Sequence, residues 1–475
     1  TLCDIPHRQR IFCRPGGTLS ADIPPTAILS RTIYLIVVVA AIGFVVFGWK
    51  PLQWLGVAGT IVFLGLEVRH IPLFQALMAV FLVSVGIIVG VELGDADPVD
   101  IALSGIAKAQ IFLVLFFAIQ WLQTPASVSP ALHAVRRTVV SQPPGRRFLY
   151  LAASGHILGS VLNVAGLVLL STMVERQKDA LLQRRMASAL MQSYVVASTW
   201  SPFFIGVVVV LIALPELRWM DAVTGGLPMA LIAIGVSWIH DRIRYRPRLS
   251  GPARPQSVPL EAPHGWNLAC VFGTLIILVI GTVEWSGLSL PVVLGFVGPP
   301  FGMIWMALIE GPTVPSRRSA WRLVRSVCGR AERLRSEALA FTASSIVGVG
   351  FAAGFPIEAV TAFAGQGGWI IFGLIFAILG LGFFGIHPLV SVIVISEAVP
   401  PAVLGMPVQV VGLSLLGAWG LTTLVSPVSG TTLMMARFVP ASSYTIAWRW
   451  NPPYTILAAT AVGLFVYAVW RMGLW

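Results

Sequence analysis

The chain has 475 residues, of which 57% are hydrophobic and only 11% are charged, and its formal net charge is +12. Average soluble domains carry about 25% charged residues, and a soluble core cannot take up this much apolar surface. The composition excludes a soluble enzyme, a disordered protein and a nucleic-acid-binding domain, and it predicts an all-α polytopic membrane protein. Continuous apolar runs such as IFLVLFFAI exclude a porin-like barrel, whose strands alternate.

A membrane-spanning helix needs roughly 20 apolar residues. By this measure the sequence predicts about eleven spans, at 28–48, 52–66, 70–92, 101–123, 186–215, 224–240, 266–284, 288–309, 338–360, 406–436 and 453–472. Residues 1–27 lack the apolar core of a signal peptide and are expected to form a cytoplasmic tail. Four scattered cysteines form no C-x-x-C pair, so no disulfide framework or zinc site is expected.

Two further apolar stretches, 147–174 and 368–400, carry Gly and His near their middle, and we expect both to be re-entrant hairpins. With the N-terminus inside, three basic residues lie outside (Lys50, Arg218 and Arg471) and Lys108 lies within a helix, whereas the other 27 of the 31 Lys and Arg lie inside. Cytoplasmic loops are enriched in Lys and Arg. This count predicts a multi-pass inner (plasma) membrane protein with a cytoplasmic N-terminus and an outer, periplasmic C-terminus.

The Pro- and Arg-rich segment 241–265 predicts a basic cytoplasmic linker between an N-terminal half, 28–240, and a C-terminal half, 266–475. Each half holds one hairpin followed by a broken helix, at 186–215 and at 406–436. A second basic segment, 316–337, predicts a helix on the inner membrane surface that faces solvent and lipid.

An internal repeat relates the two halves. GHILGSVLNVAGLV aligns without gaps on IHPLVSVIVISEAV, so that His156 falls on His387 and Ser160 on Ser391. A Ser-Pro pair follows each hairpin: Ser201-Pro202 in the first half and Ser426-Pro427 in the second. Pro202 lies 46 residues after His156, and Pro427 lies 40 residues after His387. The hairpins enter from opposite sides, which predicts the inverted repeats that secondary transporters use for alternating access.

The breaks predict the position of a binding site. Ser followed by Pro is a typical helix start, so Ser201-Pro202 and Ser426-Pro427 are expected to begin half-helices near the middle of the membrane. His387-Pro388 and the segment 160–163 are expected to begin the second hairpin arms. Four helix N-termini would then converge on an anion site. No Asp or Glu lies in the middle of a span, which disfavours a cation/proton antiporter.

Several polar residues at the tips and breaks are candidates for substrate or ion binding. They are Ser160, Asn163, Ser198, Thr199, Ser201, His387, Ser391, Ser426, Ser429 and Thr431. His156 and His387 are the titratable groups at the tips, and each is expected either to sense protons or to cap its hairpin. No cofactor and no metal other than Na⁺, as a coupling ion, is expected.

This plan resembles the ion transporter superfamily, which includes the divalent anion:sodium symporters and the arsenite-pump permeases. The resemblance is architectural and covers about residues 28–472. It implies eleven spans, an inward-opening and an outward-opening hairpin, and a broken helix after each. The symporters carry Ser-Asn-Thr at each tip, which binds Na⁺ and substrate carboxylate. Here the tips read Gly-Ser-Val-Leu-Asn, with Ser160 and Asn163, and Gly-Ile-His-Pro-Leu-Val-Ser, with His387 and Ser391. The resemblance therefore implies the fold and the site position, not the substrate.

The sequence thus predicts a secondary active transporter of a small anion, a carboxylate or an inorganic oxyanion, coupled to Na⁺ or H⁺. A cation/proton antiporter of the same fold, a membrane-embedded flippase or enzyme, and a passive channel are the alternatives; the histidines form no catalytic cluster. The expected partners are the anionic substrate and the lipid bilayer, not nucleic acid, and a homodimer is left open.

Overall fold

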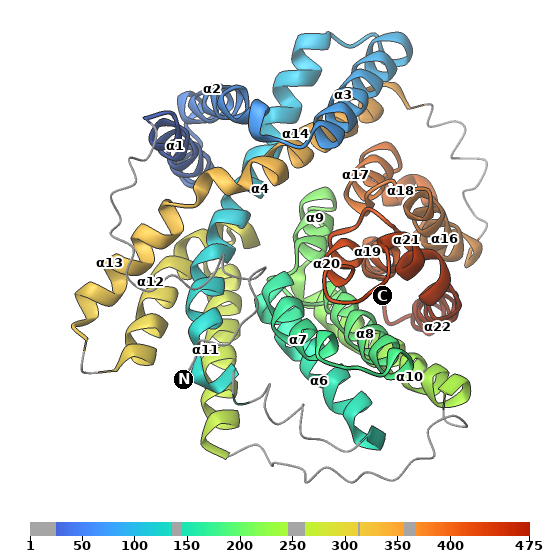
Figure 1. The fold of residues 1–475 in the computed structure, drawn as a ribbon. Coiled ribbons are helices and arrows are strands. Elements are labelled where there is room, and N and C mark those ends of the chain that lie inside the picture. Colours follow the sequence, from blue (N-terminus) through green and yellow to red (C-terminus); the bar gives the residue numbers. More distant parts are fainter. Residues whose placement is uncertain (1–24, 133, 135–143, 246–261, 312–313, 356–366) are drawn as a thin grey trace.

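The computed structural model describes residues 25–132, 134, 144–245, 262–311, 314–355 and 367–475 (Figure 1). Most of the predicted tail (1–27), most of the predicted linker (241–265) and the end of the predicted span 338–360 lie outside the described residues. Every described element is a helix. This confirms the predicted all-α fold.

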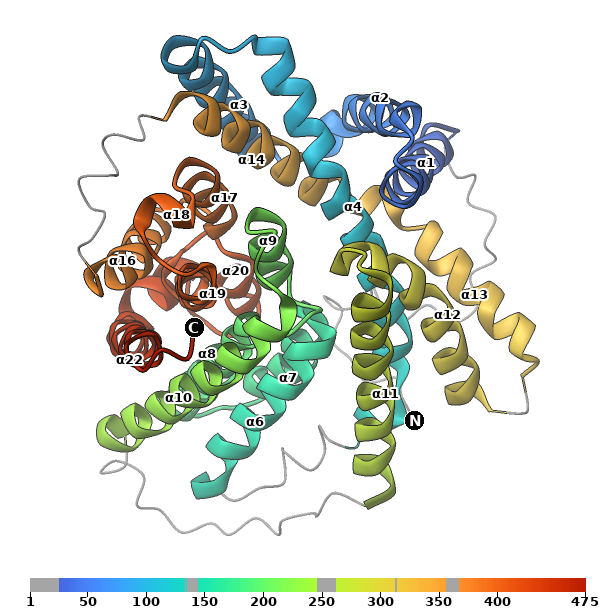
Figure 2. The same cartoon turned by 180° about the vertical axis from the view of Figure 1, so that it is seen from behind.

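The helices form two bundles that lie side by side (Figures 1 and 2). One, which we call the frame, consists of α1 (Pro25–Phe47), α2 (Lys50–Glu67), η1 (Val68–His70), α3 (Leu73–Gly94), α4 (Pro98–Val128), α11 (Ala262–Ser286), α12 (Leu290–Glu310), α13 (Ser316–Cys328), η4 (Ala331–Leu334) and α14 (Arg335–Gly354). The other, the hairpin bundle, consists of α6 (Pro144–Leu162), α7 (Val164–Glu175), α8 (Ala180–Val195), η2 (Val196–Thr199), α9 (Ile205–Ala213), α10 (Trp219–Tyr245), α16 (Trp369–Phe383), α17 (Pro388–Ala398), α18 (Pro401–Leu404), α19 (Val408–Val425), α20 (Gly430–Met435), α21 (Ser443–Thr445), η5 (Ile446–Trp450) and α22 (Pro452–Arg471). Each bundle draws helices from both predicted halves.

Ten helical segments of the described chain are long and apolar enough to span a membrane. They coincide with ten of the predicted spans, including the short second one, which forms the 18-residue helix α2. The remaining predicted span, 186–215, is interrupted, as expected: α8 ends at Val195, η2 adds one tight turn, and α9 begins at Ile205. The broken helix 406–436 is likewise divided into α19 and α20.

Both predicted hairpins are helix pairs. In hairpin 1, α6 and α7 meet at Asn163; in hairpin 2, α16 and α17 are joined by Phe384–His387. The second arms, α7 and α17, have 12 and 11 residues. At 1.5 Å per residue such helices reach only about 18 Å, well short of the roughly 30 Å hydrocarbon layer. Their length supports arms that end inside the membrane.

Small residues bring α3 and α14 of the frame into backbone contact. Gly86, Gly90 and Gly94 recur every four residues on α3 and face α14. A Cβ atom added at Gly350 would lie only 1.9 Å from the Gly86 carbonyl oxygen, and one added at Gly354 would lie 2.2 Å from the Val89 carbonyl oxygen. Stripes of small residues are typical of close helix packing in membranes, where dispersion replaces the hydrophobic effect. This interface was not among the features predicted from the sequence.

Ion pairs fix several helix ends. Arg31 near the start of α1 donates two hydrogen bonds to the Glu332 carboxylate, at 2.7 and 2.8 Å. Arg335 at the start of α14 lies 3.0 Å from Glu67 at the end of α2. The start of α1, the end of α2 and the start of α14 therefore lie at the same face of the frame. The predicted topology makes this the cytoplasmic face.

Candidate functional site

The first helix break lies between η2 and α9. Pro202 lies within its non-helical segment, as predicted, but α9 begins only at Ile205, and no side chain caps it. The expectation that Ser201-Pro202 begins the half-helix is therefore wrong. The Ser201 hydroxyl instead donates to the Ser160 carbonyl oxygen of hairpin 1 and accepts a hydrogen bond from the Phe203 amide at 3.3 Å. Ser201 thus ties the break to the hairpin.

The second break repeats this backbone pattern. Ser426 follows the last residue of α19, Pro427 lies in the turn, and α20 begins at Gly430. The expected start at Ser426-Pro427 is also wrong by three residues. The cap is Ser429, whose hydroxyl accepts a hydrogen bond from the Thr432 amide at 3.2 Å. A hydroxyl caps a helix only where it reaches the amides of the first turn, and a turn separates Ser426 from them.

The tip of hairpin 1 is closed by side-chain hydrogen bonds. Asn163 has a positive φ, of +53°, with ψ of −132°, where the chain turns from α6 into α7. The Tyr194 hydroxyl donates to Asn163 Oδ1 at 2.8 Å, and Asn163 Nδ2 lies 3.4 Å from the Phe203 carbonyl oxygen. Ser160 and Asn163 are both buried. The polar atoms of this tip are thus used to hold α8 and the first break.

His156 connects hairpin 1 to the same break. Trp200 Nε1 donates to His156 Nε2 at 3.1 Å, so Nε2 is the acceptor. The other ring nitrogen, Nδ1, lies 3.1 Å from the Ser193 carbonyl oxygen and must carry the proton of the neutral ring. Trp219 Nε1 in turn donates to the Trp200 carbonyl oxygen at 3.1 Å. Both nitrogens of His156 are therefore occupied in the neutral form.

The tip of hairpin 2 is more open. His387 caps α17 with its own side chain: Nδ1 accepts a hydrogen bond from the Leu389 amide at 3.1 Å. This confirms the predicted start of the second arm at His387-Pro388. His387 is nevertheless exposed, and the neighbouring Phe384 is 83% exposed. Nε2 of His387 has no hydrogen-bond partner among the described residues.

Three buried hydroxyl groups beside this tip lack hydrogen-bond partners within the described chain. They belong to Ser391 on α17, to Thr422 in the last turn of α19 and to Ser426 at the second break. Hairpin 2 packs against α19, and a Cβ atom at Gly382 of α16 would lie 2.0 Å from Thr422 Cγ2. Leaving a buried hydroxyl unpaired costs about 1–3 kcal/mol. Among the polar groups at the two tips and breaks, the buried hydroxyls without a partner in the described chain thus all belong to the second repeat.

The hydroxyls at the tip and break of the first repeat bond to the backbone. Ser160 donates to Ile157, Ser198 donates to Val195 at 2.7 Å, and Thr199 donates to Gly226 at 2.7 Å. In the second repeat Thr431 Oγ1 lies 3.5 Å from Thr423 Oγ1. Thr422 and Tyr194 were not predicted as site residues, although Thr422 lies only four residues before Ser426, one helical turn away.

Each hairpin contacts the broken helix of the other half. Hairpin 2 contacts the first broken helix, because α17 packs against α9. The His387 ring also meets the ring of Trp419, from its own half, edge-on with centroids 6.2 Å apart. Trp419 also packs against the first turn of α9, where a Cβ atom at Gly206 would lie 2.7 Å from its ring. Likewise, α20 of the second broken helix lies beside α7 of hairpin 1 and beside α8. Tip 2 and break 1 therefore meet at Trp419, in the interior of the hairpin bundle.

No charged side chain is among the described residues that form the two tips and breaks. Within the described chain, no group of three His, Cys, Asp or Glu side chains could hold a metal ion. The groups available to a ligand are hydroxyls, main-chain groups and His387. Such oxygens suit Na⁺, whereas hydroxyl and amide donors suit an anion.

No family model matches the chain, and no curated protein matches it in sequence. Solved structures of transporters share its fold. The YdaH transporter of Alcanivorax borkumensis superposes with a TM-score of 0.54 at 13% identity, over 84% of this chain and 98% of that one. MtrF of Neisseria gonorrhoeae, which represents a class of antimetabolite efflux pumps, superposes with a TM-score of 0.51 at 12% identity. The superposition covers 80% of this chain and 85% of MtrF. The chain is thus an all-α polytopic membrane protein with a transporter fold; the resemblance to the ion transporter superfamily stays a prediction.

Proposed function

We propose that the protein is a secondary active transporter that moves a small anion across the inner membrane by alternating access, coupled to Na⁺ or H⁺. The observation that carries this proposal is that the buried hydroxyls of Ser391, Thr422 and Ser426 have no hydrogen-bond partner in the described chain. They lie on elements that pack together, α17 and the end of α19. A bound ligand would supply the missing partners and recover the cost of burying them.

The surroundings favour an anion. Ser391 lies one turn into α17, whose N-terminus carries the positive end of the helix dipole. The only carboxylate on α17 is Glu397, and Lys108 neutralises it at 2.7 Å. A cation/proton antiporter would need a carboxylate that is free to exchange ions. A carboxylate or oxyanion instead accepts hydrogen bonds from hydroxyls without a basic side chain.

Uptake into proteoliposomes tests the proposal. The wild-type protein, supplied with a panel of small carboxylates and inorganic oxyanions, should accumulate at least one of them when a Na⁺ or pH gradient is imposed. Ser391→Ala, Thr422→Val and Ser426→Ala should each raise the apparent KM for that anion about tenfold, because each removes roughly 1.4 kcal/mol of ligand hydrogen bonding.

Ser414→Ala is the matched control. Ser414 is a buried hydroxyl on the same helix, α19, but it donates to the Val410 carbonyl oxygen at 2.7 Å. Its loss should leave the KM unchanged. Anion uptake with the same KM in all three site variants would overturn the assignment of the site. Gradient-independent movement of labelled lipid in place of anion would favour a flippase.

A further inference from the structure

The surface helix α13 (Ser316–Cys328) uses only a narrow stripe for packing. Its buried residues, Ser319, Leu323 and Val327, recur every four positions and therefore follow one face of the helix. This stripe packs against α12 and α4 of the frame. Val324 and Cys328 are half-buried against the same core, whereas Arg317, Arg318, Trp321 and Arg325 are exposed.

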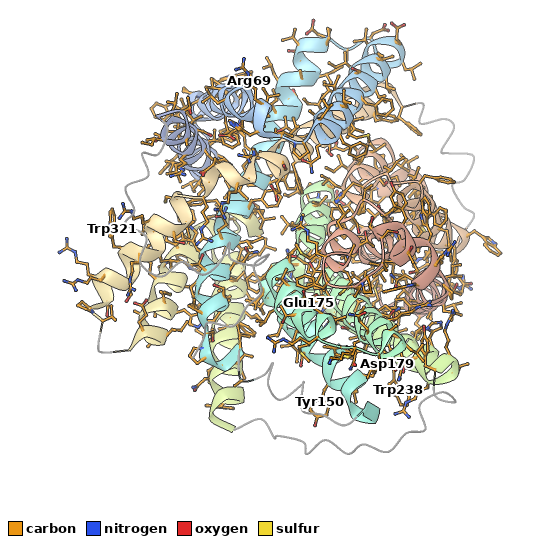
Figure 3. The ribbon with its side chains drawn as sticks, in the orientation of Figure 1. Arg69, Tyr150, Glu175, Asp179, Trp238 and Trp321 are labelled. Carbon is orange, nitrogen blue, oxygen red and sulfur yellow. The ribbon has the colours of Figure 1, made fainter. Side chains whose placement is uncertain are left out.

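The opposite face is basic and carries one large aromatic side chain. Arg317, Arg318, Arg322 and Arg325 are exposed. Trp321 is 63% exposed and projects away from the bundle (Figure 3). Half-buried Ala320 and Val324 form an apolar shoulder between Trp321 and the packed stripe. A helix that lies in the headgroup layer typically has an apolar face, a Trp at the membrane interface and basic residues on its polar face.

The arginines of this face differ from those that tie the frame together. Arg31 and Arg335 are paired with Glu332 and Glu67, and on α13 Arg322 pairs with Glu310 at 2.5 Å. Arg317, Arg318 and Arg325 form no ion pair with any residue that the structure describes. Because Arg318, Arg322 and Arg325 are spaced by four and three residues, they lie on one face of the helix. Glu310 balances the charge of Arg322, whereas no carboxylate of the described chain balances those of Arg318 and Arg325.

We propose that α13 binds the phosphate headgroup of an anionic phospholipid. Arg318 and Arg325 hold the phosphate, and Trp321 lies at the boundary between headgroup and acyl chain. Arg317, Arg318, Trp321, Arg322 and Val324 line an open hollow of about 1020 Å³ on this helix, and Arg325 lies one turn beyond Arg322 on the same face. α13 precedes the start of α14, at the face predicted to be cytoplasmic, where membranes present anionic lipid.

Native mass spectrometry of the detergent-purified full chain tests this proposal. The wild type should retain phosphatidylglycerol in preference to phosphatidylcholine. Arg318→Gln/Arg325→Gln should weaken phosphatidylglycerol binding about 30-fold, the effect of removing two basic residues from a lipid contact. Arg318→Lys/Arg325→Lys should stay within about threefold, since the charge remains. Lys50→Gln/Arg471→Gln is the matched control, because it removes two exposed charges at the opposite predicted face.

Two results would overturn the proposal. One is equal phosphatidylglycerol retention by the Gln/Gln variant and the wild type while the variant remains monodisperse. The other is complete displacement of the lipid by excess inorganic phosphate, which would make α13 a site for free phosphate. A Trp321→Ala variant should lower lipid retention but leave inorganic phosphate binding unchanged. The readout requires no transport, so it does not depend on the proposed function.

Discussion

The Lys108 ammonium lies 2.7 Å from Glu397 Oε1, and this ion pair joins α4 of the frame to α17 of the hairpin bundle. Both side chains line a cavity of about 1160 Å³ to which the two bundles contribute. Lys108 and Glu397 are 49% and 23% exposed, so the pair adds at most about 1 kcal/mol to stability. Its position matters more, because it crosses the boundary at which one bundle would move against the other.

Neutralising this pair should therefore change transport more than stability. Lys108→Gln and Glu397→Gln should each change the uptake rate by about fivefold, the effect of shifting a conformational equilibrium by roughly 1 kcal/mol. The melting temperature should move little. The exchanged pair, Lys108→Glu/Glu397→Lys, should restore the wild-type rate. Unchanged uptake in all three variants would show that the two residues do not separate during the cycle.

The two histidines should differ in their effect on the pH dependence of transport. His156 has both ring nitrogens occupied, so protonation would place an N–H against the Trp200 N–H. His156→Gln should lower stability by about 1–2 kcal/mol, through the loss of two hydrogen bonds, without moving the pH profile of uptake. His387→Gln should alter the profile, because Nε2 of His387 has no hydrogen-bond partner among the residues that the structure describes. A profile that moves only with His156→Gln would contradict this assignment.

The α3–α14 contact should not tolerate a larger residue. Gly350→Val would drive a side chain into the Gly86 carbonyl group and should lower the free energy of unfolding by about 3 kcal/mol. Gly373→Ala on α16 is the control, since a Cβ atom there meets open space. It should leave stability unchanged or raise it by about 0.5–1 kcal/mol. Thermal unfolding in detergent compares the two; equal melting temperatures would exclude a tight α3–α14 contact.

A buried ion pair stabilises the hairpin bundle. Arg185 on α8 donates two hydrogen bonds to the carboxylate of Asp241 on α10, at 2.8 and 2.6 Å. Both side chains are buried. Asp241→Asn would leave the Arg185 charge unpaired and should lower the free energy of unfolding by about 3–5 kcal/mol. Glu284→Gln, which breaks an exposed pair with Arg218 at 3.9 Å, should cost less than about 1 kcal/mol. Similar losses in both variants would contradict this difference.

The sequence by itself determined the features that depend on short stretches of chain. Apolar length set the spans, and Gly and His near the middle of two apolar stretches located the hairpins. Ser-Pro pairs located both breaks, because proline interrupts a helix. The recurrence of Gly86, Gly90 and Gly94 could also have indicated the α3–α14 contact.

Only the tertiary structure decided which polar groups are paired. The hydroxyls of Ser201 and Ser426 occupy equivalent sequence positions, yet one donates to hairpin 1 and the other has no partner in the described chain. Lys108 and Glu397 lie 289 residues apart in sequence and meet only when the bundles pack. Hydrogen bonds and ion pairs act over about 3–4 Å, so their partners are set by the packing of distant helices and cannot be read from local pattern.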